Sequence, residues 1–162
     1  MARIAAALVV SGVLAASASG AGAVHIRRST ASYDLTLSVG PREAMYTAAE
    51  VRAKHPASGE VMLDDAMGGM SMGAGNRHLE VQVESRATHT VLTVAPTITL
   101  ADASAAGGMT MGGKLHVMAM YGIDEGRSDL HYGNNVSLEA GHRYEVVVAV
   151  KGERASFAFR AS

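Results

Sequence analysis

Methionine and histidine side chains with the spacing of metal ligands gather between residues 116 and 136 of this 162-residue sequence. Met118 and Met120 lie two residues apart in a run that begins at His116, and His131 follows a segment that contains glycines. Thioethers favour Cu(I), whereas imidazole also accepts Cu(II), zinc or iron. The mixed set therefore favours copper as the bound ion, with iron or zinc as alternatives.

A second pair of candidate ligands lies upstream, where His78 and Glu80 stand in the segment RHLEVQVES. This segment alternates polar and apolar residues as a half-buried strand does, so residues two apart project to one face, roughly 7 Å from one another. One ion could contact both side chains. The alternatives are that His78 is a surface residue beside a solvated Glu80, and that His131 is a turn histidine bonded to backbone.

The residues His116, Met118 and Met120 share one face of an expected strand. Alternate residues on the inward face of a strand often form the core, so we expect at least one of these methionines to pack. His116 is then a reserve ligand.

These motifs resemble a known family. His78-x-Glu80, Met118-x-Met120 and LHYGNNV at 130–136, followed by GHRYEVVVAV, resemble the periplasmic metal-binding proteins associated with bacterial high-affinity iron uptake. The resemblance covers about residues 59–150 and implies an Ig-like or cupredoxin-like β-sandwich. It implies that His78, Glu80, Met120 or Met118, and His131 form a copper site that assists iron handling. It also implies a dimer interface at the site, with a membrane metal permease as partner.

Two glycine-rich segments echo one another, GGMSMG at 68–73 and GGMTMG at 107–112. Their flexible thioethers could collect Cu(I) and pass it to the histidine-bearing site. The alternative is that they are solvated connections whose similarity is low-complexity drift. The methionines concerned are Met67, Met70, Met72, Met109 and Met111.

The elements that must position these ligands are strands, because about eight short runs alternate polar with β-branched or aromatic residues. The runs are Tyr33 to Val39, Glu60 to Asp64, His78 to Glu84, Thr90 to Leu100, Lys114 to Tyr121, Asn135 to Leu138, Arg143 to Val150 and Arg154 to Arg160. One short helix is expected where Thr47 and Glu50 have capping-box spacing and Pro56 ends the segment. The pattern predicts an all-β antiparallel sandwich with one helix.

The length fits one domain, which we expect to span residues 24–162. Residues 1–23 carry a basic Arg3, an apolar run and small residues suited to cleavage, so they are interpreted as a secretory signal peptide. The sequence has no cysteine, which argues against a lipoprotein anchor, disulfides and a blue-copper centre. The formal net charge of −1 and scattered basic residues argue against nucleic-acid binding.

The sequence therefore predicts a periplasmic or secreted metal-binding protein, acting as a carrier, a chaperone or an accessory to metal uptake, without catalytic turnover. A copper or iron oxidoreductase that uses the same site is the second candidate. An Ig-like interaction domain without a metal is the third. Motifs of hydrolases and nucleotide-binding proteins are absent from the sequence.

Overall fold

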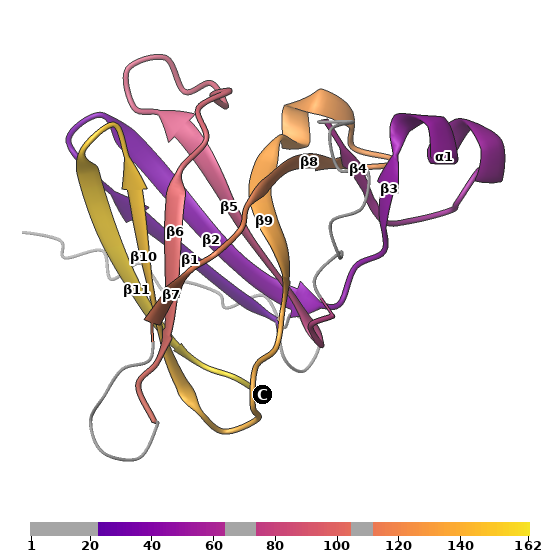
Figure 1. The fold of residues 1–162 in the computed structure, drawn as a ribbon. Coiled ribbons are helices and arrows are strands. Elements are labelled where there is room, and N and C mark those ends of the chain that lie inside the picture. The colour runs from indigo at the N-terminus through magenta and orange to yellow at the C-terminus, as the bar shows by residue number, and fades with distance from the viewer. Residues whose placement is uncertain (1–22, 64–73, 105–111) are drawn as a thin grey trace, which may run out of the picture.

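A computed structural model of the protein describes residues 23–63, 74–104 and 112–162 and shows two β-sheets packed face to face (Figure 1). The larger sheet contains β1 (Val24–Ser29), β2 (Tyr33–Pro41), β3 (Met45–Thr47), β4 (Glu60–Met62), β5 (Arg77–Ser85), β8 (Met118–Gly122) and β9 (His131–Val136). The smaller sheet contains β6 (Thr97–Asp102), β7 (Gly112–Lys114), β10 (Arg143–Val150) and β11 (Glu153–Arg160).

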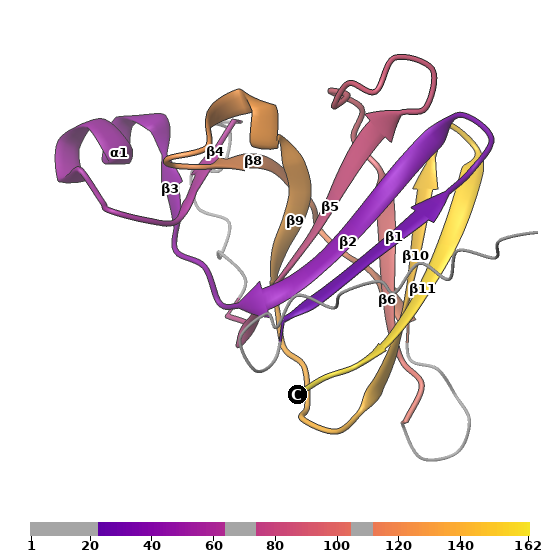
Figure 2. The same ribbon diagram turned by 180° about the vertical axis from the view of Figure 1, so that it is seen from behind.

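The strand order is β1-β2-β5-β9-β8-β4-β3 in the larger sheet and β11-β10-β6-β7 in the smaller one. Neighbouring strands are antiparallel, except that β3 and β4 run parallel. In Figure 2 the strands β1, β2 and β5 lie in front of β6, β10 and β11, so the two layers can be followed from the side of the larger sheet. The predicted all-β sandwich is confirmed.

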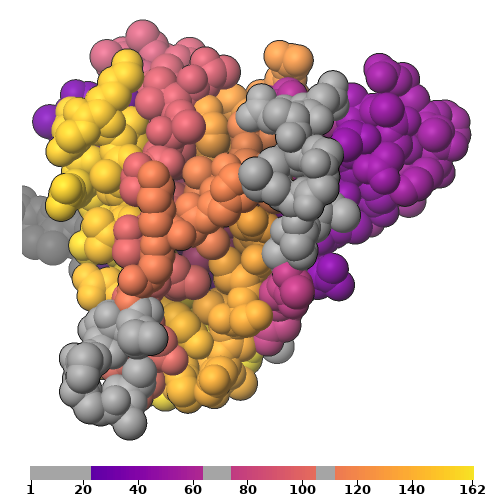
Figure 3. All heavy atoms as spheres, in the orientation of Figure 1, coloured from indigo at the N-terminus to yellow at the C-terminus, as the bar shows by residue number. Residues whose placement is uncertain are grey.

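The short helix α1 (Ala48–Lys54) forms where the capping-box spacing predicts it. The Glu50 backbone N–H donates to the Thr47 hydroxyl at 3.1 Å, and the Thr47 N–H donates to the Glu50 carboxylate at 3.0 Å. These bonds satisfy two amide groups that a helix start leaves unpaired. The helix ends at His55, which adopts a left-handed conformation. Figure 3 shows α1 and β3 projecting from one side of the sandwich.

The strand prediction differs from the structure in the segment around Pro96. The run Thr90 to Leu100 is one of the eight predicted strand runs, and β6 begins only at Thr97, directly after the proline. Upstream of it, Val91 makes a single bridge with Glu84. Proline cannot donate to a strand ladder, which explains the late start. The structure also adds β1 and β3, which were not predicted. The run predicted from Lys114 to Tyr121 is divided between the end of β7 and β8, and β9 begins at His131 rather than at Asn135.

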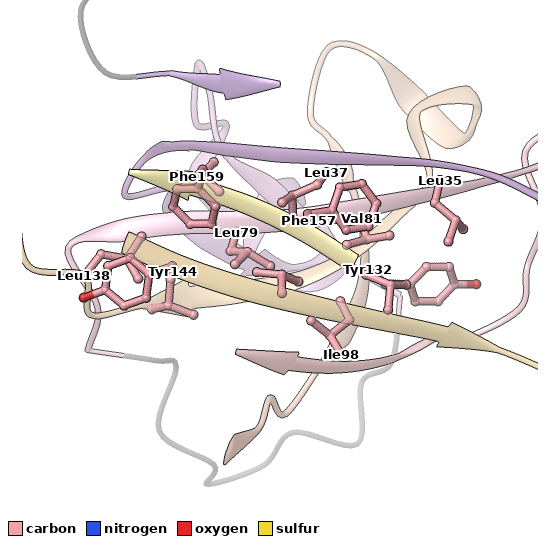
Figure 4. Close-up of a cluster of buried hydrophobic side chains, with 14 of the residues drawn as sticks. Leu35, Leu37, Leu79, Val81, Ile98, Tyr132, Leu138, Tyr144, Phe157 and Phe159 are labelled. Carbon is pink, nitrogen blue, oxygen red and sulfur yellow. The ribbon is translucent and has the colours of Figure 1, made fainter. Parts of the chain in front are cut away.

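The core lies between the sheets and takes alternate residues from β2, β5 and β9 of the larger sheet and from β6, β10 and β11 of the smaller one (Figure 4). Leu79 and Val81 of β5 and Tyr132 of β9 are buried there against Ile98 and Phe157 of the smaller sheet. Because successive strand residues face opposite sides, the residues flanking these three must lie on the outer face of the larger sheet. The core residues thereby set the orientation of the polar residues beside them.

On that outer face a second, smaller apolar cluster is buried, made of four methionines. They are Met45, Met62, Met118 and Met120. Among the described residues, no helix has both the length and the apolar character needed to cross a membrane.

Candidate metal centre

Four side chains converge on the outer face of the larger sheet: Glu60 from β4, His78 and Glu80 from β5, and His131 from β9. One ligand atom from each lies within 4.8 Å of the others. Glu60 Oε2 is 3.2 Å from His131 Nε2, and Glu80 Oε2 is 3.4 Å from the same nitrogen and 3.8 Å from His78 Nε2. The imidazole rings stand edge to face with centroids 6.0 Å apart. This arrangement could surround one ion.

The strand register explains why these four residues meet. In the β5–β9 ladder His78 is opposite Asn135 and Glu80 is opposite Gly133, so His131 is the next residue of β9 on the same face. On the other side of β9, the residue of β8 that is opposite His131 is Met120. Met120 in turn faces Met62 of β4, two residues after Glu60. Cross-strand neighbours on one face are close enough for side chains to touch.

Gly133 lets the ligand strands approach closely. A Cβ atom at this position would collide with the Leu79 carbonyl oxygen and lie 2.9 Å from the Glu80 Cα atom. The glycine of the HYGNN motif is therefore required by the packing of β9 on β5, and it leaves the space beside Glu80 free of a side chain.

Three of the converging atoms are buried and make no regular hydrogen bond among the described residues: Glu60 Oε2, His78 Nε2 and His131 Nε2. Glu60 Oε2 and His131 Nε2 face one another as an ion pair, so their nearest polar neighbours are other atoms of the cluster. The side chains of Glu60, His78 and His131 are only 10%, 4% and 3% exposed. A buried polar atom without a partner costs about 1–3 kcal/mol. A bound cation would satisfy all three atoms at once, and imidazole nitrogen with carboxylate oxygen is a donor set that suits a divalent transition metal.

The other nitrogen of each ring is held by an acceptor. His78 Nδ1 lies 3.2 Å from the Asn135 side-chain oxygen, and His131 Nδ1 lies 2.8 Å from the Asp129 carbonyl oxygen. The Asn135 amide is fixed by the Glu43 backbone, which donates to its oxygen at 3.3 Å and accepts from its nitrogen at 2.9 Å. An acceptor at Nδ1 requires the proton there, so Nε2 is the nitrogen that faces the ion.

In the metal-free protein His131 holds a second proton at neutral pH. Burial lowers the pKa of His131, but the Glu60 and Glu80 carboxylates outweigh this effect and raise the pKa to about 9. Because this value lies above the ordinary 6.5, the proton stabilises the folded apoprotein fully below about pH 6.5. That stabilisation is lost as the pH rises through 9.

An incoming ion must displace this proton, so Cu(II) affinity should rise with pH by up to about tenfold per unit between pH 7 and 9. Chelator-buffered copper titrations at several pH values measure the slope, and calorimetry in two buffers of different ionisation enthalpy counts the protons released. We expect close to one proton per ion from His131 at pH 7. A flat affinity across this range would contradict the assignment of His131 as a ligand.

The structure brings some of the predicted site residues together and separates others. His78, Glu80 and His131 come together; Met120, 0% exposed, and Met118 lie beside them in the methionine cluster, opposite His131 and Gly133 respectively. His116 is exposed and lines a different cavity, together with residues of β6 and β7. The five methionines of the glycine-rich segments fall outside the described residues: Met67, Met70, Met72, Met109 and Met111.

Sequence reasoning missed Glu60. Its strand is only three residues long, and its side chain reaches the site because β4 pairs with β8. The only sequence signal was that Glu60 begins a predicted strand, which places a carboxylate two residues before Met62 on the same face.

The fold of the chain is similar to that of FetP from uropathogenic Escherichia coli. A copper-bound variant of FetP matches with a TM-score of 0.53 and 12% identity, over 86% of this chain and 95% of that chain. The as-isolated FetP, recombinantly expressed in the periplasm of E. coli, matches with a TM-score of 0.52 and 14% identity, over 87% and 97%. Neither a family model nor a curated protein matches the sequence. At these identities the likeness shows a shared sandwich fold.

Proposed function

We propose that the protein is an extracytoplasmic copper-binding protein in which Glu60, His78, Glu80 and His131 hold the ion. The observation that carries the proposal is the convergence of four ligand atoms within 4.8 Å of one another, three of which are buried and make no regular hydrogen bond. The fold similarity to a copper-bound protein supports copper. The predicted signal peptide and the periplasmic expression of that FetP support a location outside the cytoplasm.

The role we propose is that of a carrier, a chaperone or an accessory to metal uptake. Two carboxylates and two imidazoles that are largely buried surround the ion with protein donors, as suits retention and release of an ion. An oxidoreductase would keep one position open for its substrate. The same proposal includes a link to iron handling, a membrane permease as partner and a dimer with the site at its interface.

The test is metal analysis of the mature protein together with titration by Cu(II), Cu(I), Zn(II) and Fe(II). We expect one Cu(II) per chain at this site, bound more tightly than Zn(II), as the affinity order of divalent metals requires. Histidine nitrogen should be visible in the electron paramagnetic resonance spectrum of the Cu(II) form. A protein that binds no metal would support the interaction-domain alternative. A protein that binds one iron ion per chain instead of copper would assign the site to iron.

Replacing Met120 by Leu should weaken Cu(I) binding by at least about tenfold while changing Cu(II) binding little, because only the thioether distinguishes the soft ion. The change preserves side-chain volume and usually costs less than about 1.5 kcal/mol of stability. Competition with a Cu(I) chelator measures the effect. Met62→Leu is the control, because Met62 belongs to the same cluster but is opposite Met120 and Thr47, whereas Met120 is opposite His131. Equal Cu(I) affinities in the native protein and Met120→Leu would make Met120 a packing residue, and Met118 would be tested next.

A further inference from the structure

We propose that His25 is an outer copper ligand, which captures Cu(II) at the mouth of a surface cavity and passes it to Glu80 of the inner site. This inference rests on the proposed function, and it adds a residue and a route to that site. The transfer is a ligand exchange, in which the bond from copper to the His25 nitrogen breaks as a bond to the Glu80 oxygen forms, without a change of oxidation state.

The cavity has a volume of about 300 Å³ and connects the edge of the larger sheet with the metal centre. At its outer end it is lined by His25 and Ser38, from β1 and β2. At its inner end it is lined by Glu60, His78 and Glu80, three of the four donors. An ion that enters here therefore meets an exposed imidazole before it meets the buried ligands.

Strand register places His25 in line with Glu80. His25 is opposite Ser38 in the β1–β2 ladder, and Ser38 is opposite Glu80 in the β2–β5 ladder. All three side chains therefore share the outer face, and two strand spacings separate His25 from Glu80 by about 10 Å. Glu80 is the most exposed of the four donors, at 29%, so it is the first inner ligand that an ion in the cavity reaches.

The ring of His25 is oriented for this role. Its Nδ1 atom lies 3.2 Å from the Ser38 hydroxyl oxygen, which leaves Nε2 as the nitrogen available to an ion. Other histidines outside the site have different neighbours: His89 lies 3.4 Å from Glu84, and His142 lies between Asp102 and Glu139. Among the described residues, neither His89 nor His142 lines the two cavities that contain donors of the site.

A second cavity, of about 340 Å³, also reaches Glu60 and Glu80 and offers a competing route. It is lined by the carboxylates of Asp124, Glu125 and Asp129. Carboxylates attract cations of many kinds, whereas imidazole binds Cu(II) more selectively. We therefore assign copper to the cavity that contains His25.

Stopped-flow loading with Cu(II) tests the proposal, with quenching of tyrosine fluorescence as the signal, since Tyr132 adjoins His131 and the chain has no tryptophan. His25→Gln should slow loading by about tenfold while the equilibrium Cu(II) affinity changes less than about threefold. The control His89→Gln alters another exposed histidine and should load at the native rate. In the native protein, copper added well below one equivalent should broaden the NMR signals of the His25 ring as well as those of His78 and His131.

Native loading kinetics in His25→Gln would overturn the inference, and so would slowing in Glu125→Gln without slowing in His25→Gln, because the ion would then use the acidic cavity. These outcomes leave copper binding itself intact. Failure of the native protein to bind Cu(II) at equilibrium would instead overturn the proposed function.

Discussion

Replacing His131 by Gln is expected to lower Cu(II) affinity by more than about 100-fold, the largest effect of any single change at the site. His131 Nε2 is within 3.4 Å of both Glu60 and Glu80, so it is the central donor of the four. Loss of a direct ligand should exceed the 10-fold to 100-fold effects that are typical of residues behind the ligands. Competition titration with a Cu(II) chelator at pH 7 measures the loss.

The same substitution should destabilise the metal-free protein at pH 7. Glu60 has a side chain nine-tenths buried, and protonated His131 is its positive partner. Removing one member of a buried pair costs about 3 kcal/mol, which urea unfolding resolves. Circular dichroism establishes that His131→Gln remains folded in the binding assay, and His89→Gln serves as the surface control. Native copper affinity in a folded His131→Gln protein would contradict the proposed site.

The second large effect is expected at Asn135, which orients His78 without facing the ion. Asn135→Leu removes the acceptor for His78 Nδ1 and should lower Cu(II) affinity by about 10-fold to 100-fold. Asn135→Asp keeps an oxygen for His78 but loses the amide donor to the Glu43 carbonyl. Both variants should therefore lose stability, whereas only Asn135→Leu should lose most of its affinity.

This pair of variants separates orientation of the ligand from general damage to the fold. Nitrogen-15 NMR of the imidazoles in the metal-free protein reports which ring nitrogen carries the proton. We expect His78 to carry it on Nδ1 in the native protein and in Asn135→Asp, and to lose this preference in Asn135→Leu. Equal loss of affinity in both variants would reduce Asn135 to a packing residue.

Much of the ligand geometry follows from strand periodicity. The alternation around His78 and Glu80 predicts that both face away from Leu79, and the structure places Leu79 in the core and the other two at the site. The capping box that begins at Thr47 predicts α1 from local hydrogen bonding alone. Such features are predictable because they depend on residues close together in the sequence.

Glu60 and His25 could not be found in this way. Glu60 reaches His131 only because two intervening pairings, β4 with β8 and β8 with β9, bring their strands together. His25 aligns with Glu80 through two further pairings, β1 with β2 and β2 with β5. Strand order is a long-range property that depends on how the whole sheet assembles, so a local pattern does not specify it.

The opposite faces of the larger sheet have separate tasks, and this has a consequence for how the protein can change over evolutionary time. Leu79, Val81 and Tyr132 hold the sandwich together from one side, while His78, Glu80 and His131, between and beside them, face the other side and take no part in that core. Unlike a zinc finger, whose folding requires its metal, this scaffold keeps its own apolar core. The chemistry of the ion site can therefore be remodelled, or the site lost, in a lineage that retains the same architecture.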